Sequence, residues 1–399
     1  MTGRERIRLG DVLAIKHGFA FKGEHFGDAG EYLVLTPGHF QLGGGIKFRG
    51  EREKYYTADF PPEFLLSRDD LVVVMTDLKQ DAPILGSPAV IPADGLFLHN
   101  QRLGKVTDLD ERRVDPRYLY YLFCADSTRA QIRATATGAT VRHTAPRRIY
   151  EVLVDLPPIP TQRLVGAILS AYDGLIENNT RRTEILEEMA QAIYREWFVE
   201  FRYPRHEGVP LIGSDLGPIP EGWGAGQLRD VVELAYGKAL KADDRRGGSV
   251  AVYGSGGVVG WHNIALVPGP GVVVGRKGNV GSVYWSDGPF FPIDTTYYVK
   301  TRLPLTFVYF ALRDLEFIDS HAAVPGLSRD QAYGLPFVVP SAEVCNRFDE
   351  IISPIFALRR ALCSATENLR ATRDLLLPRL ISGEIDVSGL DIDMGDAAA

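Results

Sequence analysis

Four consecutive polar residues in the first third of the chain carry side chains suited to reading nucleic-acid bases. His99-Asn100-Gln101-Arg102 places two carboxamides beside a guanidinium. Asn and Gln pair with adenine and Arg pairs with guanine in the major groove, so this cluster would suit base recognition. A hairpin end with solvated polar side chains is the alternative, and the residue types alone do not separate the two.

Basic residues gather in two further places. Between Thr128 and Tyr150 the chain has five arginines and no acidic residue: Arg129, Arg133, Arg142, Arg147 and Arg148. Guanidinium groups bind phosphate oxygens, and such contacts position a protein on a duplex, so we favour phosphate contact over a merely solvated surface. The turn from Gly275 to Asn279 contains Arg276 and Lys277, and a simple hairpin with exposed charge is an equal alternative there.

Residue patterns for catalysis are sparse. Asp70, Asp77 and Lys79 flank a valine-rich strand, and two carboxylates with a lysine are the groups of a metal-dependent nuclease core. The signal is weak because the residue types are common and the second half has no equivalent. The chain lacks the Asn/Asp-Pro-Pro-Tyr/Phe motif that holds a flipped adenine, so methylation would need a partner. We expect no metal site, and the 3 cysteines, which lack paired spacing, are expected to be buried apolar residues.

Two internal repeats organise the chain. Residues 9–22 match residues 228–241 at an offset of 219, with Asp11, Gly18 and Lys22 aligned to Asp230, Gly237 and Lys241. The segment from Pro157 to Phe201 recurs at an offset of 183, beginning at Pro340. The chain is therefore predicted to consist, in order, of a variable domain, a helix, a second variable domain and a second helix.

Both copies of the second repeat have apolar residues at seven-residue intervals, which is typical of a long helix with one buried seam. The series are Val165-Tyr172-Leu186-Ile193 and Ile168-Leu175-Met189 in the first copy, and Phe348-Ile355-Leu362-Leu369-Leu376 in the second. Pro354 lies within the second copy, and proline costs about 3 kcal/mol in a helix interior. We therefore expect a break there, with the longer helix beginning near Ser353.

Short β-branched and apolar runs bounded by Gly, Pro and Asp indicate strands in both variable segments. They are Tyr32–Thr36, Leu71–Met75, Val250–Tyr253, Gly271–Val274, Val280–Trp285 and Thr295–Val299. Each variable segment also contains an expected helix, one from Pro116 to Ala134 and one that begins at Thr306.

Composition and charge narrow the class of protein. The 399 residues are 45% hydrophobic with a net charge of -7, and the acidic excess lies in the helical segments while the variable segments are neutral overall. A neutral domain can bind DNA through one basic face, but strong nonspecific binding usually requires a more basic domain. No run approaches 18 apolar residues and the first residues do not resemble a signal peptide, so a cytoplasmic location is expected.

Several phrases, taken in order, resemble the DNA specificity subunit of type I restriction-modification systems. They are Leu9-Gly-Asp-Val12, Met75-Thr-Asp-Leu78, His99-Asn-Gln-Arg102, Leu156-Pro-Pro-Ile-Pro160-Thr-Gln162, Trp197-Phe198, Ile219-Pro-Glu-Gly-Trp223 and Leu376-Leu-Pro-Arg-Leu-Ile-Ser-Gly-Glu-Ile385. No single phrase is specific, but the ordered set covers nearly the whole chain. The sequence departs from the family's pattern at Pro354 and in its short second domain.

The resemblance implies an α+β fold: two mixed, β-rich target recognition domains in tandem, separated by two long antiparallel spacer helices, with a pseudo-twofold internal repeat. The expected boundaries are 1–156 for the first recognition domain, 157–203 for the first spacer helix, 204–223 for a linker, 224–340 for the second recognition domain, 341–385 for the second spacer helix and 386–399 for a disordered tail. Each recognition domain would read one half of a bipartite double-stranded DNA sequence. The span from Thr161 to Val199 would be about 58 Å long if fully helical, which would make the gap between half-sites a property of the helices.

The resemblance also implies partners and places the chemistry outside this chain. Two modification subunits would carry S-adenosylmethionine and methylate adenine at N6, and a restriction subunit using ATP and Mg²⁺ would join for cleavage. The chain itself would hold no cofactor and catalyse no step. A helical assembly scaffold that does not read DNA is the main alternative, favoured by the neutral charge of both variable segments, and a metal-dependent nuclease is a weaker one.

The residues expected to contact DNA are polar and basic groups of the predicted loops. They are Lys22, Arg49, Asn100, Gln101, Arg102, Arg142 and His143 in the first domain, and Lys241, Arg245, Arg276, Lys277 and Arg329 in the second. Contact with partner subunits is expected at Trp197, Phe198, Leu376 and Leu380.

Overall fold

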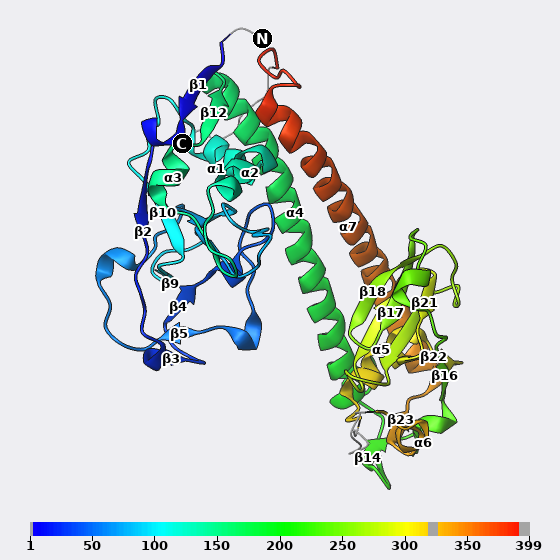
Figure 1. Cartoon of the computed structure of the whole chain (residues 1–399). Coiled ribbons are helices and arrows are strands. Elements are labelled where there is room, and N and C mark those ends of the chain that lie inside the picture. Colours follow the sequence, from blue (N-terminus) through cyan, green and yellow to red (C-terminus); the bar gives the residue numbers. More distant parts are fainter. Residues whose placement is uncertain (1–2, 318–325, 391–399) are drawn as a thin grey trace. The chain divides into compact units, whose positions relative to one another are not determined.

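The computed structural model describes residues 3–317 and 326–390. The chain divides into two compact units: unit 1 comprises residues 1–177 and 366–399, and unit 2 comprises residues 178–365. Both boundaries fall inside long helices, α4 (Ile159–Tyr194) and α7 (Ala342–Ser382). Each unit therefore combines one β-rich fold with part of each helix, and the tandem α+β architecture predicted from the repeats is confirmed (Figure 1).

Unit 1 contains two four-stranded sheets. One is antiparallel with the order β2-β10-β6-β8, and the other has the order β3-β5-β4-β9 with β4 and β9 parallel. β1 pairs with β12, and β7 pairs with β11. The strands are β1 (Glu5–Arg8), β2 (Ala14–His17), β3 (Phe26–Gly27), β4 (Tyr32–Leu35), β5 (Tyr55–Tyr56), β6 (Leu71–Val74), β7 (Thr76–Asp77), β8 (Pro88–Val90), β9 (Phe97–His99), β10 (Leu103–Thr107), β11 (Arg142–His143) and β12 (Leu153–Leu156).

The continuous valine run of strand β6 is explained by the burial of both faces of the strand. Val73 packs into a core that includes helical side chains such as Leu119 and Val165, whereas Val72 and Val74 pack into a separate core on the other face. A strand that is buried on both faces has no polar alternation to display.

Unit 2 repeats the same plan with fewer residues. Its four-stranded antiparallel sheet has the order β16-β22-β19-β20, a three-stranded sheet has the order β18-β17-β21, and β15 pairs with β23. The hairpin β13–β14 lies within the segment expected to be a linker. The strands are β13 (Leu211–Ser214), β14 (Gly217–Pro220), β15 (Gly224–Gln227), β16 (Val232–Tyr236), β17 (Val250–Gly254), β18 (Gly257–His262), β19 (Gly271–Gly275), β20 (Val283–Ser286), β21 (Phe290–Pro292), β22 (Thr296–Thr301) and β23 (Pro336–Val339).

The helix predicted from Pro116 to Ala134 is two helices, α1 (Pro116–Cys124) and α2 (Asp126–Ala134). Ala125 between them has an extended backbone with φ −63° and ψ 132°, so the first helix ends there. The Nε of Arg129 donates to the carbonyl of Cys124 and satisfies one group at that end. The other short helices are α3 (Pro146–Tyr150), α5 (Leu305–Asp314) and α6 (Arg329–Tyr333).

The internal repeat extends to individual hydrogen bonds. The Tyr150 hydroxyl accepts from the Ile15 amide at 2.9 Å, and the Tyr333 hydroxyl accepts from the Leu234 amide at 3.0 Å. The tyrosines differ by the 183-residue offset and the strand residues by the 219-residue offset. Each bond ties the short helix α3 or α6 to the first strand of its main sheet.

We expect Tyr150→Phe and Tyr333→Phe to destabilise their own units by similar amounts. Each change leaves one inward-facing backbone amide without its acceptor, which costs about 1 to 3 kcal/mol. Hydrogen exchange of the Ile15 and Leu234 amides measures the two effects separately. Protection that falls in both strands for either single variant would contradict the assignment of one bond to each unit.

Helix α7 runs through Pro354, so the predicted break near Ser353 is wrong. Proline removes the hydrogen bond to the carbonyl of Glu350, but both residues are exposed and water can bind that carbonyl. On the opposite face Phe348, Ile352 and Phe356 are buried in the core of unit 2. Burial of each such side chain contributes roughly 1.5 to 3 kcal/mol, which together outweighs the cost of the proline.

The apolar seams are only partly buried, because within each unit the part of each long helix packs against the β-rich fold along one side only. Val165 and Phe348 are buried as predicted, whereas Leu175 and Met189 are 54% and 49% exposed.

Cys124 and Cys345 are buried, but Cys363 is exposed on α7, so the prediction of three buried cysteines is wrong for that residue. α4 continues into a π-helical turn (Arg195–Val199) that buries Trp197 and Phe198.

The structure can be compared with two further predictions, the disordered C-terminal tail and the absence of a membrane-spanning segment. Val387, in the segment expected to be a disordered tail, is buried in the core of unit 1, while residues 391–399 lie outside the described residues. Among the residues that the structure describes, no helix is both long enough and apolar enough to span a membrane.

Candidate nucleic-acid interface

Each unit has an equivalent corner where the loop after a central strand meets the segment that leads into a short helix. In unit 1 the amide of Thr144 donates to the carbonyl of Met75 at 3.0 Å, just before α3. In unit 2 the amide of Leu327 donates to the carbonyl of Arg276 at 2.7 Å, just before α6. We call these places the first corner (residues 75–77 and 142–148) and the second corner (residues 275–279 and 326–329).

The second corner gathers cations around an exposed aromatic ring. The guanidinium carbons of Arg276 and Arg329 each lie 5.0 Å from the ring centroid of Tyr236, which is 47% exposed. Arg276 also donates to the carbonyl of Asp294 at 3.0 Å, and Lys277 beside it is exposed. Cation–π stacking holds the guanidinium groups in place while leaving donors for an outside partner. The structure thus brings Arg329 close to Arg276 and Lys277, from which it is far apart in sequence.

The first corner has a similar composition but uses its groups differently. Arg142 is half-buried, and it donates to the carbonyls of Gly138 at 3.1 Å and Ala136 at 3.2 Å. His143 is exposed, and its Nδ1 lies 2.9 Å from the hydroxyl of Thr76. Arg142 therefore shapes its own loop, and DNA contact by Arg142 or His143 remains a prediction.

The run of five arginines is not one continuous cationic surface. Asp126, just before the run, lies 2.8 Å from an Nη of Arg133 and 3.6 Å from an Nη of Arg129. Arg129 is also buried, with an exposed fraction of 7%. Burial leaves Arg129 unavailable for phosphate contact, whereas Arg133, seven residues after Asp126, forms a partly exposed ion pair with it, and phosphate contact by Arg133 remains a prediction. Arg147 and Arg148 are exposed at the first corner, and one Nη of Arg148 also donates to the carbonyl of Thr135 at 2.9 Å and to the hydroxyl of Thr137 at 3.0 Å.

The polar cluster at 99–102 forms the connection between β9 and β10. His99 is buried and its Nε2 donates to the carbonyl of Leu103 at 3.0 Å, while the Oδ1 of Asn100 accepts from the amide of Arg102 at 3.0 Å. Burial lowers the pKa of His99 to about 4, so the ring is neutral at neutral pH. Gln101 and Arg102 are exposed, which leaves these two side chains of the predicted base-reading cluster available for outside contacts.

The other predicted DNA contacts lie on loops of their own. Lys22, Arg49 and Lys241 are exposed, whereas Arg245 is half-buried and donates to the carbonyl of Val259 at 2.6 Å. The structure does not bring these residues into either corner.

The loop that carries Arg49 is held by a buried pair, His39 and Glu53. Their Nε2 and Oε2 atoms lie 2.6 Å apart, and Glu53 also accepts from the backbone amide of Arg49. Burial acts to raise the pKa of Glu53, but the hydrogen bonds from Arg49 and His39 outweigh it and lower that pKa. Because the carboxylate is ionised at neutral pH, it anchors the loop at both ends.

The residues expected to bind partner subunits pack in the hydrophobic cores of the two units. Trp197 and Phe198 are buried in unit 2, Leu380 is buried in unit 1, and Leu376 packs against the same core. Partner contact through these side chains remains a prediction, and their structural role is evident from the burial.

The carboxylates of the nuclease alternative are committed to internal partners. The two carboxylate oxygens of Asp77 accept from the amides of Lys79 and Ile84 at 2.9 Å each, and Asp70 forms an ion pair with Lys105 at 2.6 Å. In the described part of the chain, no group of three His, Cys, Asp or Glu side chains is placed to hold a metal ion. The hydrogen bond from the amide of Lys79 follows from the local sequence, because an Asp side chain commonly accepts from the backbone amide two residues later in a turn.

Sequence reasoning missed Tyr236 as a part of the second corner. Its position in the first repeat is occupied by His17, so the repeat gave no aromatic signal there. The only available clue was the alignment of residues 9–22 with 228–241, which places position 236 next to the glycine that ends the strand.

Comparisons with known proteins agree with this architecture. Residues 1–188 match the family model described as the type I restriction modification DNA specificity domain. The chain is 21% identical over 313 residues to the type I restriction enzyme MjaIX specificity subunit of Methanocaldococcus jannaschii, a match that covers 68% of this chain and 70% of the relative. It is 24% identical over 257 residues to the EcoBI specificity subunit of Escherichia coli, covering 61% of this chain and only 50% of that relative.

A solved structure shares the fold. The crystal structure of a type-I restriction-modification system S subunit from M. genitalium superposes with a TM-score of 0.63 at 18% identity, covering 94% of this chain and 96% of that one. At that identity the likeness concerns the fold alone. Residues 1–188 thus match the family model of the type I restriction modification DNA specificity domain, and the chain, as the ordered phrases predicted, resembles the specificity subunits of type I restriction-modification systems.

Proposed function

We propose that this chain is the DNA-recognition subunit of a type I restriction-modification complex, and that each β-rich fold reads one half of a bipartite double-stranded DNA sequence. The observation that carries the proposal is the equivalent corner in each unit, where cationic side chains gather at the same place of a repeated fold. A repeated fold with a repeated cationic site suits two half-sites better than one continuous site. Exposed Arg147 and Arg148 would serve the first half-site, and the group around Tyr236 would serve the second.

The long helices offer surfaces for the partner subunits. On unit 1, Leu175 of α4 and Leu375 of α7 are 54% and 70% exposed. On unit 2, exposed apolar side chains are Ile185, Met189, Ile351 and Leu358. Apolar residues left exposed at helical spacing indicate a surface that another helix covers. We propose that two modification subunits dock there.

The chemistry would belong to the partners. The modification subunits would bind S-adenosylmethionine and methylate adenine N6, and the restriction subunit would use ATP and Mg²⁺ for cleavage. This chain would bind the duplex, hold the half-sites at a constant spacing and supply no reacting group.

A methylation map tests the proposal. Host DNA is compared after expression of this chain with a candidate adenine-modification subunit and after expression of the modification subunit alone. We expect a new split motif, two short half-sites at one spacing, because two folds on a common helical support read two sequences. An unchanged map from an assembled, active complex would reject the proposal and favour the helical scaffold.

Helix length offers a second arm of the same experiment. α4 has 36 residues, so it is about 54 Å long at 1.5 Å per residue. Removing seven residues from the middle of both helices preserves the apolar faces and shortens each by about 10 Å, or roughly three base pairs of duplex. The gap of the methylated motif should shrink while both half-site sequences stay the same.

A further inference from the structure

In unit 1 a carboxylate of α4 joins three elements. Asp173 lies 2.5 Å from an Nη of Arg373 on α7, and it accepts from the hydroxyl of Tyr121 on α1 at 2.6 Å. Arg373 and Asp173 have side-chain exposures of 27% and 32%, so water screens the pair only in part. We call Asp173, Arg373 and Tyr121 the first carboxylate cluster.

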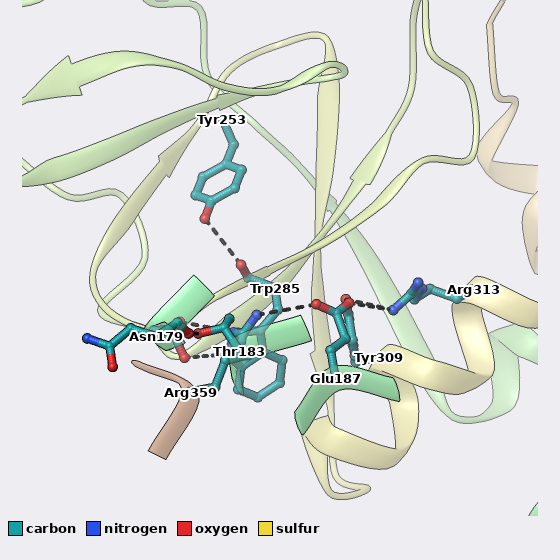
Figure 2. A network of polar contacts seen from close by, with 9 residues as sticks. Asn179, Thr183, Glu187, Tyr253, Trp285, Tyr309, Arg313 and Arg359 are labelled. Atoms are coloured by element: carbon teal, nitrogen blue, oxygen red, sulfur yellow. Dashed lines mark hydrogen bonds and ion pairs between the residues drawn. The ribbon is translucent and has the colours of Figure 1, made fainter. Parts of the chain in front are cut away.

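Unit 2 contains a cluster of the same composition (Figure 2). Glu187 on α4 accepts from the hydroxyl of Tyr309 on α5 at 3.3 Å, and it lies 4.0 Å from an Nη of Arg359 on α7. Arg313 of α5 donates to the same carboxylate at 3.0 Å. The second carboxylate cluster, Glu187, Arg359 and Tyr309, again joins α4, α7 and the helix that follows the main sheet.

Arg359 extends the second cluster into the sheet. It donates to Asp287 at 3.0 Å, and the indole Nε1 of Trp285 donates to the other oxygen of that carboxylate at 2.8 Å. The hydroxyl of Tyr253 donates to the carbonyl of Trp285 at 3.2 Å, as Figure 2 shows. A chain of polar contacts thus leads from α4 through α7 to strands β20 and β17.

The residue spacings of the two clusters are consistent with a single alignment of α4 against α7. Asp173 and Glu187 are fourteen residues apart on α4, and Arg359 and Arg373 are fourteen residues apart on α7, in the reverse order. Fourteen residues are two heptads, so both clusters occupy the same position of the seven-residue pattern. Sliding one helix by a turn along the other would separate both carboxylates from their arginines, so both ion pairs are sensitive to the register of the two helices.

The energetics favour a role in specificity over one in stability. The Nε of Arg359 is buried without a hydrogen-bond partner, which is unfavourable. Replacing buried ion pairs by apolar residues is often neutral or stabilising, and their best-attested use is to select one register of paired helices.

We propose that the two carboxylate clusters are positioning devices that fix the register of α4 against α7, and that their tyrosines fix each β-rich fold on that helix pair. The inference rests on the proposed bipartite reading of DNA. The clusters would then define the spacing between half-sites without touching DNA, and the corners would define the half-site sequences.

The test compares methylation by complexes assembled with variant chains on a library of duplexes whose half-sites are separated by the native gap and by gaps one and two base pairs shorter or longer. Asp173→Arg places two arginines face to face, and we expect the preference for the native gap to fall about tenfold, as for typical coupling between neighbouring charges. The exchange Asp173→Arg with Arg373→Asp restores the opposite charges and should recover most of the preference. Glu367→Arg, an exposed acid on α7 of the same unit, is the matched control and should leave the gap profile unchanged.

Milder variants guard against a loss of folding. Tyr121→Phe and Tyr309→Phe remove only a hydroxyl, and each should broaden the gap profile while both half-site sequences stay as they are. Variants that lower the melting temperature but keep the native gap profile would overturn the inference and leave the clusters with a purely structural role. A wild-type complex that methylates no split motif would instead reject the proposed function, so the two failures are distinguishable.

Discussion

The double variant Arg276→Ala with Arg329→Ala is expected to bind the complete DNA target on the order of a hundredfold more weakly than the wild-type chain in the same complex. Both guanidinium groups flank the exposed ring of Tyr236, and the loss of each removes a contact worth about 1 to 3 kcal/mol. The slope of affinity against salt should also become shallower, because fewer phosphates are neutralised. Fluorescence anisotropy of the assembled complex on a labelled duplex, at about 50 to 200 mM salt, measures both quantities.

Two control variants distinguish a loss of DNA contacts from a general loss of folding. Arg302→Ala removes an exposed arginine of the same unit from outside the corner and should change affinity little. Arg276→Lys keeps the charge but loses the planar stacking on Tyr236, so we expect an intermediate loss. The first half-site should be read unchanged in every variant. Equal losses in the Arg302 and Arg276 variants, or binding that ignores salt, would favour the scaffold over DNA reading.

Acidification is expected to loosen the β9–β10 region of unit 1 between about pH 6.5 and pH 4. His99 is buried, and burial together with nearby Lys105 and Lys16 lowers its pKa from 6.5 to about 4. In this interval the unfolded state binds a proton that the folded state does not, so protonation favours unfolding. The stability is complete above pH 6.5 and declines as the pH falls, by on the order of 3 kcal/mol at pH 4.

Hydrogen exchange of the amides in β9 and β10 at several pH values measures this loss after correction for the intrinsic exchange rate. His99→Gln removes the titration while keeping a group that can donate to the carbonyl of Leu103, so the variant should show a flatter profile over the same interval. The difference between the two profiles isolates His99 from the other histidines. Parallel profiles in wild type and variant would show that the ring is not the responsible group.

The repeated plan of the chain could be predicted from its residues alone. Offsets of 219 and 183 residues predicted paired domains and paired helices, and the bonds of Tyr150 and Tyr333 confirm that equivalence atom by atom. Strand and helix positions followed from periodicity, because a half-buried helix and a buried strand each require apolar residues at characteristic intervals. The ordered phrases predicted the resemblance that the comparisons confirm.

Which charged groups face outward depends on the packing of elements that are distant in sequence. Asp126 forms ion pairs with both Arg129 and Arg133 because helix α2 places the three side chains on one face, although the arginine run begins after the acid in sequence. Pro354 stays within α7 because apolar burial on one face outweighs a lost hydrogen bond on the other, a balance that local propensity does not contain.

The two functional features that depend most on long-range folding were the least visible in sequence. Arg276 and Arg329 meet at Tyr236 only because the loop after β19 lies beside the segment before α6. Asp173 and Arg373 are 200 residues apart and meet only because folding brings the first part of α4 beside the last part of α7 in unit 1. Residue spacing predicts elements because hydrogen bonding and side-chain periodicity are local, whereas charge pairing and exposure depend on which elements pack together, and only the tertiary structure determines that.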